Sequence, residues 1–247
     1  MNLPPKLEEA VQNHGYPLLF ATIDGAHLYG LPATTMQFTV RGVHVVPTEQ
    51  VIGLDVTEDL VEISKTEDDA ELDLSTHDIK KFFQLMLNDN GHVMEQLYSP
   101  LVVFTSDNHN ELKEIGKNCL TRLHCYHYLG LADAQWQLLG KDSAKRVSAL
   151  LSVYRIVLTG THLMNSAAIE TNLHTLNQNF ALPYLSELLE KVTAETILDE
   201  KEWDFHKEEY ERLREVLEDA ADATALPEKS TAKGALNDLL VRVRLRT

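Results

Sequence analysis

The spacing of apolar residues changes near residue 110, from a period typical of strands to one typical of helices. Before that point, an apolar run at 18–23 is bounded by Pro17 and Asp24, and residues 38–46 alternate in a pattern rich in β-branched side chains. Both segments are therefore predicted to be strands. Three shorter strands are predicted to extend the sheet, at Val51–Leu54, Val61–Ser64 and Glu71–Leu74.

Helical periodicity follows the predicted sheet. A first helix is predicted to begin at Ser75 or Thr76, either of which can cap orphan amides, to carry apolar residues from Ile79 onward and to end at Asn90-Gly91. From Glu111 the pattern is almost wholly helical. The expected helices lie at 111–139, 142–165, 183–192, 200–222 and 232–244.

Composition and charge narrow the class of protein. The chain has 247 residues, of which 44% are hydrophobic and 24% charged, an ordinary globular balance for one or two domains. The formal charge of −16 repels nucleic-acid phosphates, so non-specific binding to duplex DNA is not expected. Arg242, Arg244 and Arg246 offer a local basic strip, which we interpret as a structural tail in preference to a phosphate-binding strip.

Two further features concern location and redox state. The longest apolar runs, such as 100–104, are much shorter than the ~20 residues that span a bilayer, so no membrane segment is expected. The N-terminus has neither a basic start nor an apolar stretch, which makes a cytoplasmic protein the default expectation. Cys119 and Cys125 would face different sides of a helix, so free thiols are predicted in preference to a disulfide.

Candidate chemistry begins at a glycine turn that follows the first predicted strand, Gly25-Ala26-His27-Leu28-Tyr29-Gly30. Such a turn lets backbone amides approach a phosphate closely, although two glycines after a strand are structural in most proteins. The presence of His27, Tyr29 and Arg41 strengthens the interpretation of the turn as a phosphate-binding site. The predicted nucleotide-binding residues are therefore Gly25, Ala26, His27, Tyr29 and Arg41.

This turn and several later motifs resemble a predicted nucleotidyltransferase family of the polymerase-beta superfamily, some members of which are associated with RNA-repair ligases. The resemblance covers nearly the whole chain. It is carried by Gly25–Gly30, Val40–His44, Glu71–Phe83, Asn90–Val103, His127–Gly130, Tyr154–Arg155 and Leu158–Leu163.

The resemblance implies an α/β (α+β) fold, with a polymerase-beta-like nucleotidyltransferase domain built on a mixed sheet at 1–110 and a helical domain at 111–247. It also implies two metal-binding aspartates at positions 37 and 39, on one face of a strand. Asp73 matches a third carboxylate on a neighbouring strand. In the superfamily these side chains bind two Mg²⁺ ions that hold a nucleoside triphosphate for attack by an acceptor hydroxyl.

The two aspartate positions are occupied here by Gln37 and Thr39, and position 35, often acidic in relatives, is Thr35. Mg²⁺ prefers charged oxygen ligands, which neither an amide nor a hydroxyl replaces well. Asp73 alone is expected to bind metal weakly. Asp24 beside the turn is a substitute ligand or, in our preferred interpretation, an ordinary turn former.

Other clusters have simpler interpretations. Cys119, His124, Cys125 and His127 contain zinc-type ligands, but their spacing on a helix does not favour a metal site. His77-Asp78 lies where a helix cap is expected, in preference to an acid–base pair. Lys80-Lys81 would reach a triphosphate or form a solvated face.

Three functions stay open from the sequence. The first is a catalytically degenerate family member that retains a nucleotide-phosphate pocket, and this is our prediction. The second is an active enzyme that uses Mg²⁺ and a nucleoside triphosphate to modify RNA, a small molecule or a protein. The third is a non-catalytic protein-interaction module. Nucleotide preference and acceptor do not follow from these residues.

Overall fold

The computed structural model describes residue 9 and residues 11–32, 37–54, 57–67, 70–193 and 196–246. The chain divides into two compact units. Unit 1 consists of Met1–Gly25, Thr35–Cys119 and Lys229–Thr247, and unit 2 consists of Ala26–Thr34 and Leu120–Glu228. Position 35 lies outside the described residues.

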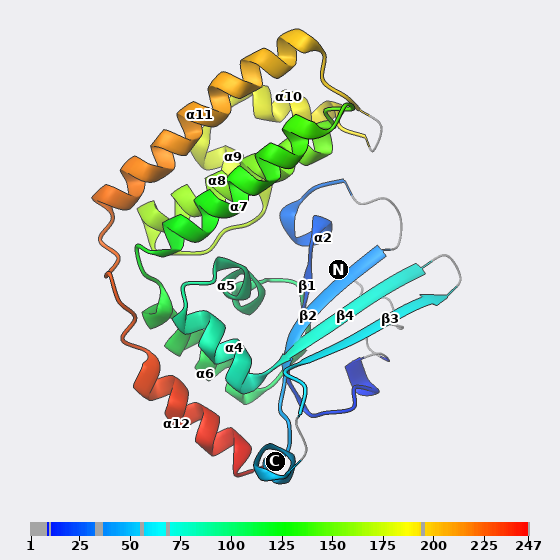
Figure 1. Cartoon of the computed structure of the whole chain (residues 1–247), viewed down its shortest axis with the longest axis vertical. Coiled ribbons are helices and arrows are strands. Elements are labelled where there is room, and N and C mark those ends of the chain that lie inside the picture. The colour runs from blue at the N-terminus through cyan, green and yellow to red at the C-terminus, as the bar shows by residue number, and fades with distance from the viewer. Residues whose placement is uncertain are drawn as a thin grey trace. The chain divides into compact units, whose positions relative to one another are not determined.

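Unit 1 is built on a five-stranded mixed sheet with the order β3-β4-β2-β1-β5 (Figure 1). The strands β2 and β4 are parallel, and the other neighbouring pairs are antiparallel. The strands are β1 Leu18–Asp24, β2 Gln37–His44, β3 Leu60–Glu67, β4 Ala70–Asp78 and β5 Val102–Thr105. The predicted strands at 18–23, 38–46, 61–64 and 71–74 are thus confirmed, with shifted ends.

One face of this sheet is apolar. Ile23, Val40, Leu74 and Ile63 are cross-strand neighbours and belong to one apolar cluster. Because successive side chains of a strand alternate, the residues between them point to the other face. That second face packs against helices at one end, where the Phe20 ring lies edge-on to Phe82.

The helices of unit 1 include three that lie on this second face, namely α4, α5 and α6 (Figure 1). The C-terminal helix α12 packs against α4 and α6. The bounds are α3 Thr48–Ile52, α4 Ile79–Leu87, α5 Gly91–Tyr98, α6 Asp107–Gly116, a 3₁₀ turn at Lys117–Cys119 and α12 Lys233–Arg244.

Three predictions for unit 1 were wrong in detail. The segment predicted as a strand at Val51–Leu54 is not a strand, because its first two residues form the end of α3 and Gly53 follows as the C-cap. The helix predicted from Ser75 or Thr76 begins at Ile79, because Asp78 supplies the cap by accepting the Lys80 N–H at 2.9 Å. The predicted end at Asn90-Gly91 is the start of α5, which the Asn90 side chain caps.

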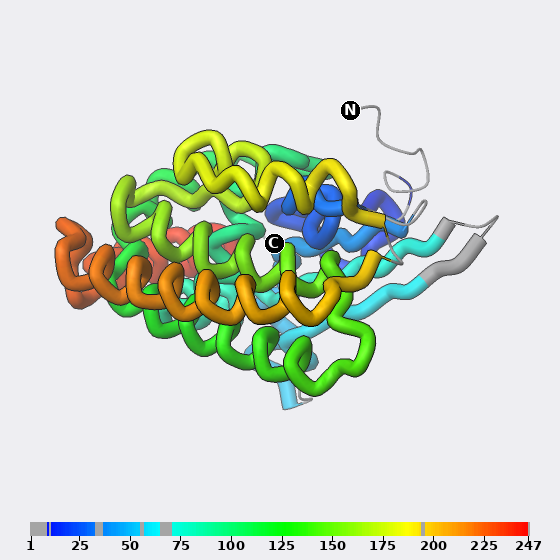
Figure 2. The backbone as a smooth tube through the Cα atoms, turned by 90° about the horizontal axis from the view of Figure 1, so that it is seen from above, coloured from blue at the N-terminus to red at the C-terminus, as the bar shows by residue number. Residues whose placement is uncertain are grey.

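Unit 2 is helical, and its long helix α8 packs against both α7 and α11. Figure 2 shows α11, in orange, running alongside α7 and α8, in green. The helices are α2 Ala26–Tyr29, α7 His124–Lys141, α8 Val147–Ser166, α9 Leu173–Phe180, α10 Pro183–Lys191 and α11 Glu200–Ala223. The helix α9 was not predicted, and the segment predicted as one helix at 111–139 contains the end of α6 and most of α7.

Among the helices of the described residues, one is long and apolar enough, by length and composition, to cross a membrane. It is α8, and 78% of its most apolar window is buried inside the structure. The sequence expectation considered only unbroken apolar runs and overlooked this helix. Burial of this extent is what the central helix of a packed helical unit shows.

The two compact units do not coincide with the predicted domains 1–110 and 111–247. The helix α6 and the C-terminal α12 belong to unit 1, whereas α2 belongs to unit 2. Whether the chain has independently folding domains with a boundary at 110 stays a prediction.

Candidate functional site

A polar row crosses the second face of the sheet in unit 1. Asp24 on β1 is the register partner of Thr39 on β2, which pairs in turn with Asp73 on β4. Ser64 on β3 completes the row. Thr39 therefore occupies the position between two carboxylates that come from its neighbouring strands.

Two polar side chains of β2 on this face, Arg41 and Gln37, bind to their own sheet. Arg41 Nη2 lies 2.8 Å from Asp73 Oδ2, and Arg41 Nη1 donates to the carbonyl oxygens of Val40 and Asp73 at 3.0 and 3.2 Å. Gln37 Nε2 donates to Glu71 Oε2 at 3.0 Å. The guanidinium of Arg41 thus neutralises the Asp73 carboxylate, which is 40% exposed.

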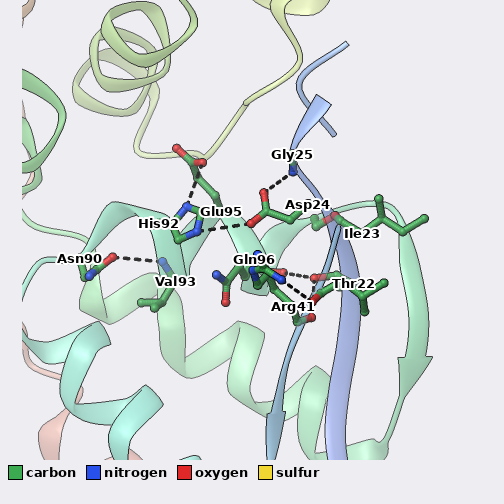
Figure 3. A network of polar contacts seen from close by, with 12 residues as sticks. Thr22, Ile23, Asp24, Gly25, Arg41, Asn90, His92, Val93, Glu95 and Gln96 are labelled. Carbon is green, nitrogen blue, oxygen red and sulfur yellow. Dashed lines mark hydrogen bonds and ion pairs between the residues drawn. The ribbon is translucent and has the colours of Figure 1, made fainter. Parts of the chain in front are cut away.

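Asp24 is held by a second set of contacts at the end of β1 (Figure 3). The Gly25 backbone N–H donates to Asp24 Oδ1 at 2.6 Å, and His92 Nε2 lies 3.3 Å from Asp24 Oδ2. Figure 3 shows the His92 ring between Asp24 and Glu95, with Nδ1 3.9 Å from Glu95 Oε2. Both carboxylates are almost fully buried, whereas the His92 side chain is 44% exposed.

The sequence places Gly25 at this point for a conformational reason. Its φ is +70°, in the left-handed region that glycine adopts without strain. A Cβ at this position would lie 3.5 Å from Thr39 Oγ1. The turn therefore brings the Gly25 backbone next to the row that contains Thr39.

These residues do not fit a pair of Mg²⁺ ions. The central position holds a hydroxyl in Thr39, and each flanking carboxylate already has a nitrogen partner, the His92 imidazole for Asp24 and the Arg41 guanidinium for Asp73. Within the described ranges, no three His, Cys, Asp or Glu side chains are grouped to hold a metal ion. Two Mg²⁺ ions need several carboxylate oxygens free to coordinate them.

The second half of the glycine turn belongs to unit 2. There, α2 contains Ala26, His27 and Tyr29, and the Tyr29 ring stacks under the Arg155 guanidinium, 3.9 Å from the ring centroid. Arg155 is buried on α8. This contact anchors α2 to its own unit, and a nucleotide-binding role of Ala26, His27 and Tyr29 stays a prediction.

Two of the three C-terminal arginines, Arg242 and Arg244, have structural side-chain contacts, as the interpretation as a structural tail predicts. Arg244 lies 2.7 Å from Asp78 Oδ1 and also donates to the Val46 carbonyl oxygen. Arg242 pairs with Glu111 and with Asp238. Asp78 is therefore both a helix cap and half of a buried ion pair.

The cysteines and His124 of the segment 119–127 are also part of the packed structure. Both thiols are free and buried, as predicted. Burial raises the pKa of Cys119 to about 11, and that of Cys125 to the same value. His124 Nδ1 lies against the Thr121 backbone and hydroxyl, at the start of α7.

Sequence reasoning missed His92 and Glu95 as members of the site. Their spacing of three residues places them on one face of a helix, and Glu95 follows the apolar pair Val93-Met94. That pattern signals a buried carboxylate. It does not identify Asp24 as the second carboxylate, because the contact joins residues 68 positions apart in the chain.

Three comparisons place the chain among known proteins. The model of the RNA repair pathway DNA polymerase beta family matches residues 3–242. An uncharacterised protein of Methanocaldococcus jannaschii is 25% identical over 154 residues, which make up 62% of this chain and 63% of that relative, so the match spans less than two thirds of its length. A solved nucleotidyltransferase-like protein from Exiguobacterium sibiricum is 12% identical with a TM-score of 0.34, over 97% of this chain and 79% of that one.

Proposed function

Because this chain belongs to the RNA repair pathway DNA polymerase beta family, we propose that it is a nucleotidyltransferase-like protein that has lost two-metal catalysis and binds the phosphates of a nucleotide without Mg²⁺. The observation that carries this proposal is the row Asp24–Thr39–Asp73, in which a hydroxyl stands between two carboxylates that each already contact a side chain of the protein, His92 or Arg41.

Phosphate binding would use the donors that surround this row. Gly25 offers a backbone N–H in a left-handed turn, Arg41 offers a guanidinium, and His92 offers a half-exposed imidazole. Amides in such turns and guanidinium groups are the common phosphate donors of proteins. All three residues lie in unit 1.

A second candidate is residual Mg²⁺-dependent nucleotidyl transfer. It is favoured by one observation, that Asp24 and Asp73 lie on either side of Thr39. A single ion held by these two side chains would require both to leave their present partners, His92 and Arg41. RNA, a small molecule or a protein would be the acceptor.

Isothermal titration with each nucleoside triphosphate, in Mg²⁺ and then in EDTA, separates the two candidates. We expect the unmodified chain to bind equally well under both conditions. The double variant Gln37→Asp/Thr39→Asp restores the two missing carboxylates and should bind more tightly in Mg²⁺ than in EDTA. The neutral variant Gln37→Asn/Thr39→Asn is the matched control.

Binding by the unmodified chain that disappears in EDTA would overturn the proposal and favour the second candidate. Absence of binding by the unmodified chain, by the double variant and also by variants in which Asp24 or Asp73 is replaced by Asn would leave the family fold without a nucleotide site. The protein would then act through protein partners.

A further inference from the structure

The donors predicted to bind phosphate are already occupied by the protein's own carboxylates. Asp24 Oδ1 accepts the Gly25 N–H at 2.6 Å, and Asp73 Oδ2 lies 2.8 Å from Arg41 Nη2. Gly25 follows the end of β1 and Arg41 lies on β2, and each is paired with a different aspartate. We propose that Asp24 and Asp73 are internal competitors of the phosphate, so that the site is autoinhibited.

The geometry of Asp24 supports competition. A carboxylate oxygen at 2.6 Å from an amide nitrogen occupies the place that a phosphate oxygen would take. His92 and the buried surroundings fix this carboxylate, since its side chain is only 4% exposed. An incoming phosphate therefore meets both a blocked donor and a like charge.

Asp73 acts on the other donor in the same way. Arg41 donates from Nη2 to the Asp73 carboxylate and from Nη1 to two carbonyl oxygens of the sheet. The guanidinium is therefore bound to its own sheet. The ion pair is partly open to solvent, with side-chain exposures of 23% and 40%. A phosphate can exchange with a carboxylate in a pair of this kind at modest cost.

This inference rests on the proposed function and describes its regulation. Any agent that neutralises or withdraws the two aspartates, such as a cationic group of a partner or of the acceptor, would free Gly25 and Arg41 together. The site would then bind the phosphates of a nucleotide more tightly.

The test is isothermal titration of ATP, in EDTA, into the full chain and into Asp24→Asn, Asp73→Asn and the double variant. Each single variant should bind about tenfold more tightly than the unmodified chain or better, because one anionic acceptor is replaced by a neutral one of the same shape. The two gains should multiply in the double variant, since the donors are separate. Asp73 is half-exposed, so its variant tests the proposal even where Asp24→Asn disturbs folding.

Glu62→Gln is the matched control, because Glu62 lies on the same face of the sheet, in register with Ser75, and loses the same charge. A gain as large in Glu62→Gln would reduce the effect to overall charge and overturn the proposal. If the unmodified chain binds and neither aspartate variant gains, the autoinhibition is wrong and the proposed function stands.

If only the aspartate variants bind, the autoinhibition is correct and the unmodified chain needs a trigger. If neither the unmodified chain nor any of the variants binds ATP, both the autoinhibition and the proposed function are wrong. Thermal unfolding of each variant verifies that the fold is intact.

Discussion

Acidification should destabilise unit 1 through the buried histidine His44. Its ring stacks on Tyr16, and its Nδ1 lies 2.9 Å from Thr76 Oγ1, a hydroxyl that it shares with His14 Nε2. In the described part of the chain, His44 Nε2 is buried without a hydrogen-bond partner. Burial, opposed in part by Asp78 and assisted by His14, lowers the pKa of His44 to about 4.

The magnitude follows from this pKa. In the unfolded chain His44 titrates near 6.5, so between pH 6.5 and 4 the unfolded state binds a proton that the folded state does not. The contribution of neutral His44 to the free energy of unfolding is therefore fully present above pH 6.5 and is lost as the pH falls toward 4. At about 1.4 kcal/mol for each pKa unit, His44 accounts for a loss of about 3 kcal/mol, with a slope near pH 5 of about 1 kcal/mol per pH unit.

The assay is denaturant unfolding at several values between pH 7 and 4.5, followed by far-UV circular dichroism. Trp136 and Trp203 are the two tryptophans and both lie in unit 2, so tryptophan fluorescence follows that unit separately. His44→Asn keeps a polar atom near Thr76 and removes the titrating group. It should lower stability at pH 7 and reduce the pH slope of unit 1 by about 1 kcal/mol per pH unit.

Val43→Ala is the control, because it removes buried apolar atoms next to His44 without removing a titrating group. It should lower stability at every pH and leave the slope unchanged. If His44→Asn keeps the full slope of the unmodified chain, the assignment of acid sensitivity to His44 is refuted. His109, whose pKa burial also lowers to about 4, would then be the next candidate.

Two further predictions concern the contacts that hold each unit together. Arg244→Ala leaves the Asp78 carboxylate buried with only its backbone amide partners. This variant should reduce the free energy of unfolding of unit 1 by about 3 kcal/mol. A small effect, like that expected for the more exposed Arg242→Ala, would contradict a buried ion pair. Tyr29→Leu removes the aromatic face beneath Arg155 and should reduce the stability of unit 2 by about 2 kcal/mol in tryptophan-detected unfolding. Tyr29→Phe keeps the aromatic face and should lose less stability than Tyr29→Leu, and an equal loss in the two variants would contradict a role of the aromatic face.

The sheet could be predicted from the sequence because its strands have strong local signals. The alternation of β2 and the apolar run of β1 each end at a turn residue, and the same alternation places positions 37, 39 and 41 on one face. The short run Val51-Ile52-Gly53-Leu54 misled the prediction, since so short an apolar run suits the end of a helix as well as a strand.

The contacts of the site could not be predicted in the same way. The family resemblance predicts Thr39 and Asp73 as positions of the site, and the glycine turn with Arg41 predicts a phosphate donor, but the pairing of Arg41 with Asp73 depends on the parallel register of β2 and β4. The contact of His92 with Asp24 depends on where α5 packs against β1. Both are long-range properties that no local pattern encodes.

The most direct test of the account is the affinity of the unmodified chain for ATP, measured by isothermal titration in Mg²⁺ and again in EDTA. A site that holds phosphate through Gly25, Arg41 and His92 predicts dissociation constants that agree within about twofold under the two conditions. Binding that requires Mg²⁺ would contradict the account, and would mean that Asp24 and Asp73 leave their partners to hold a metal ion.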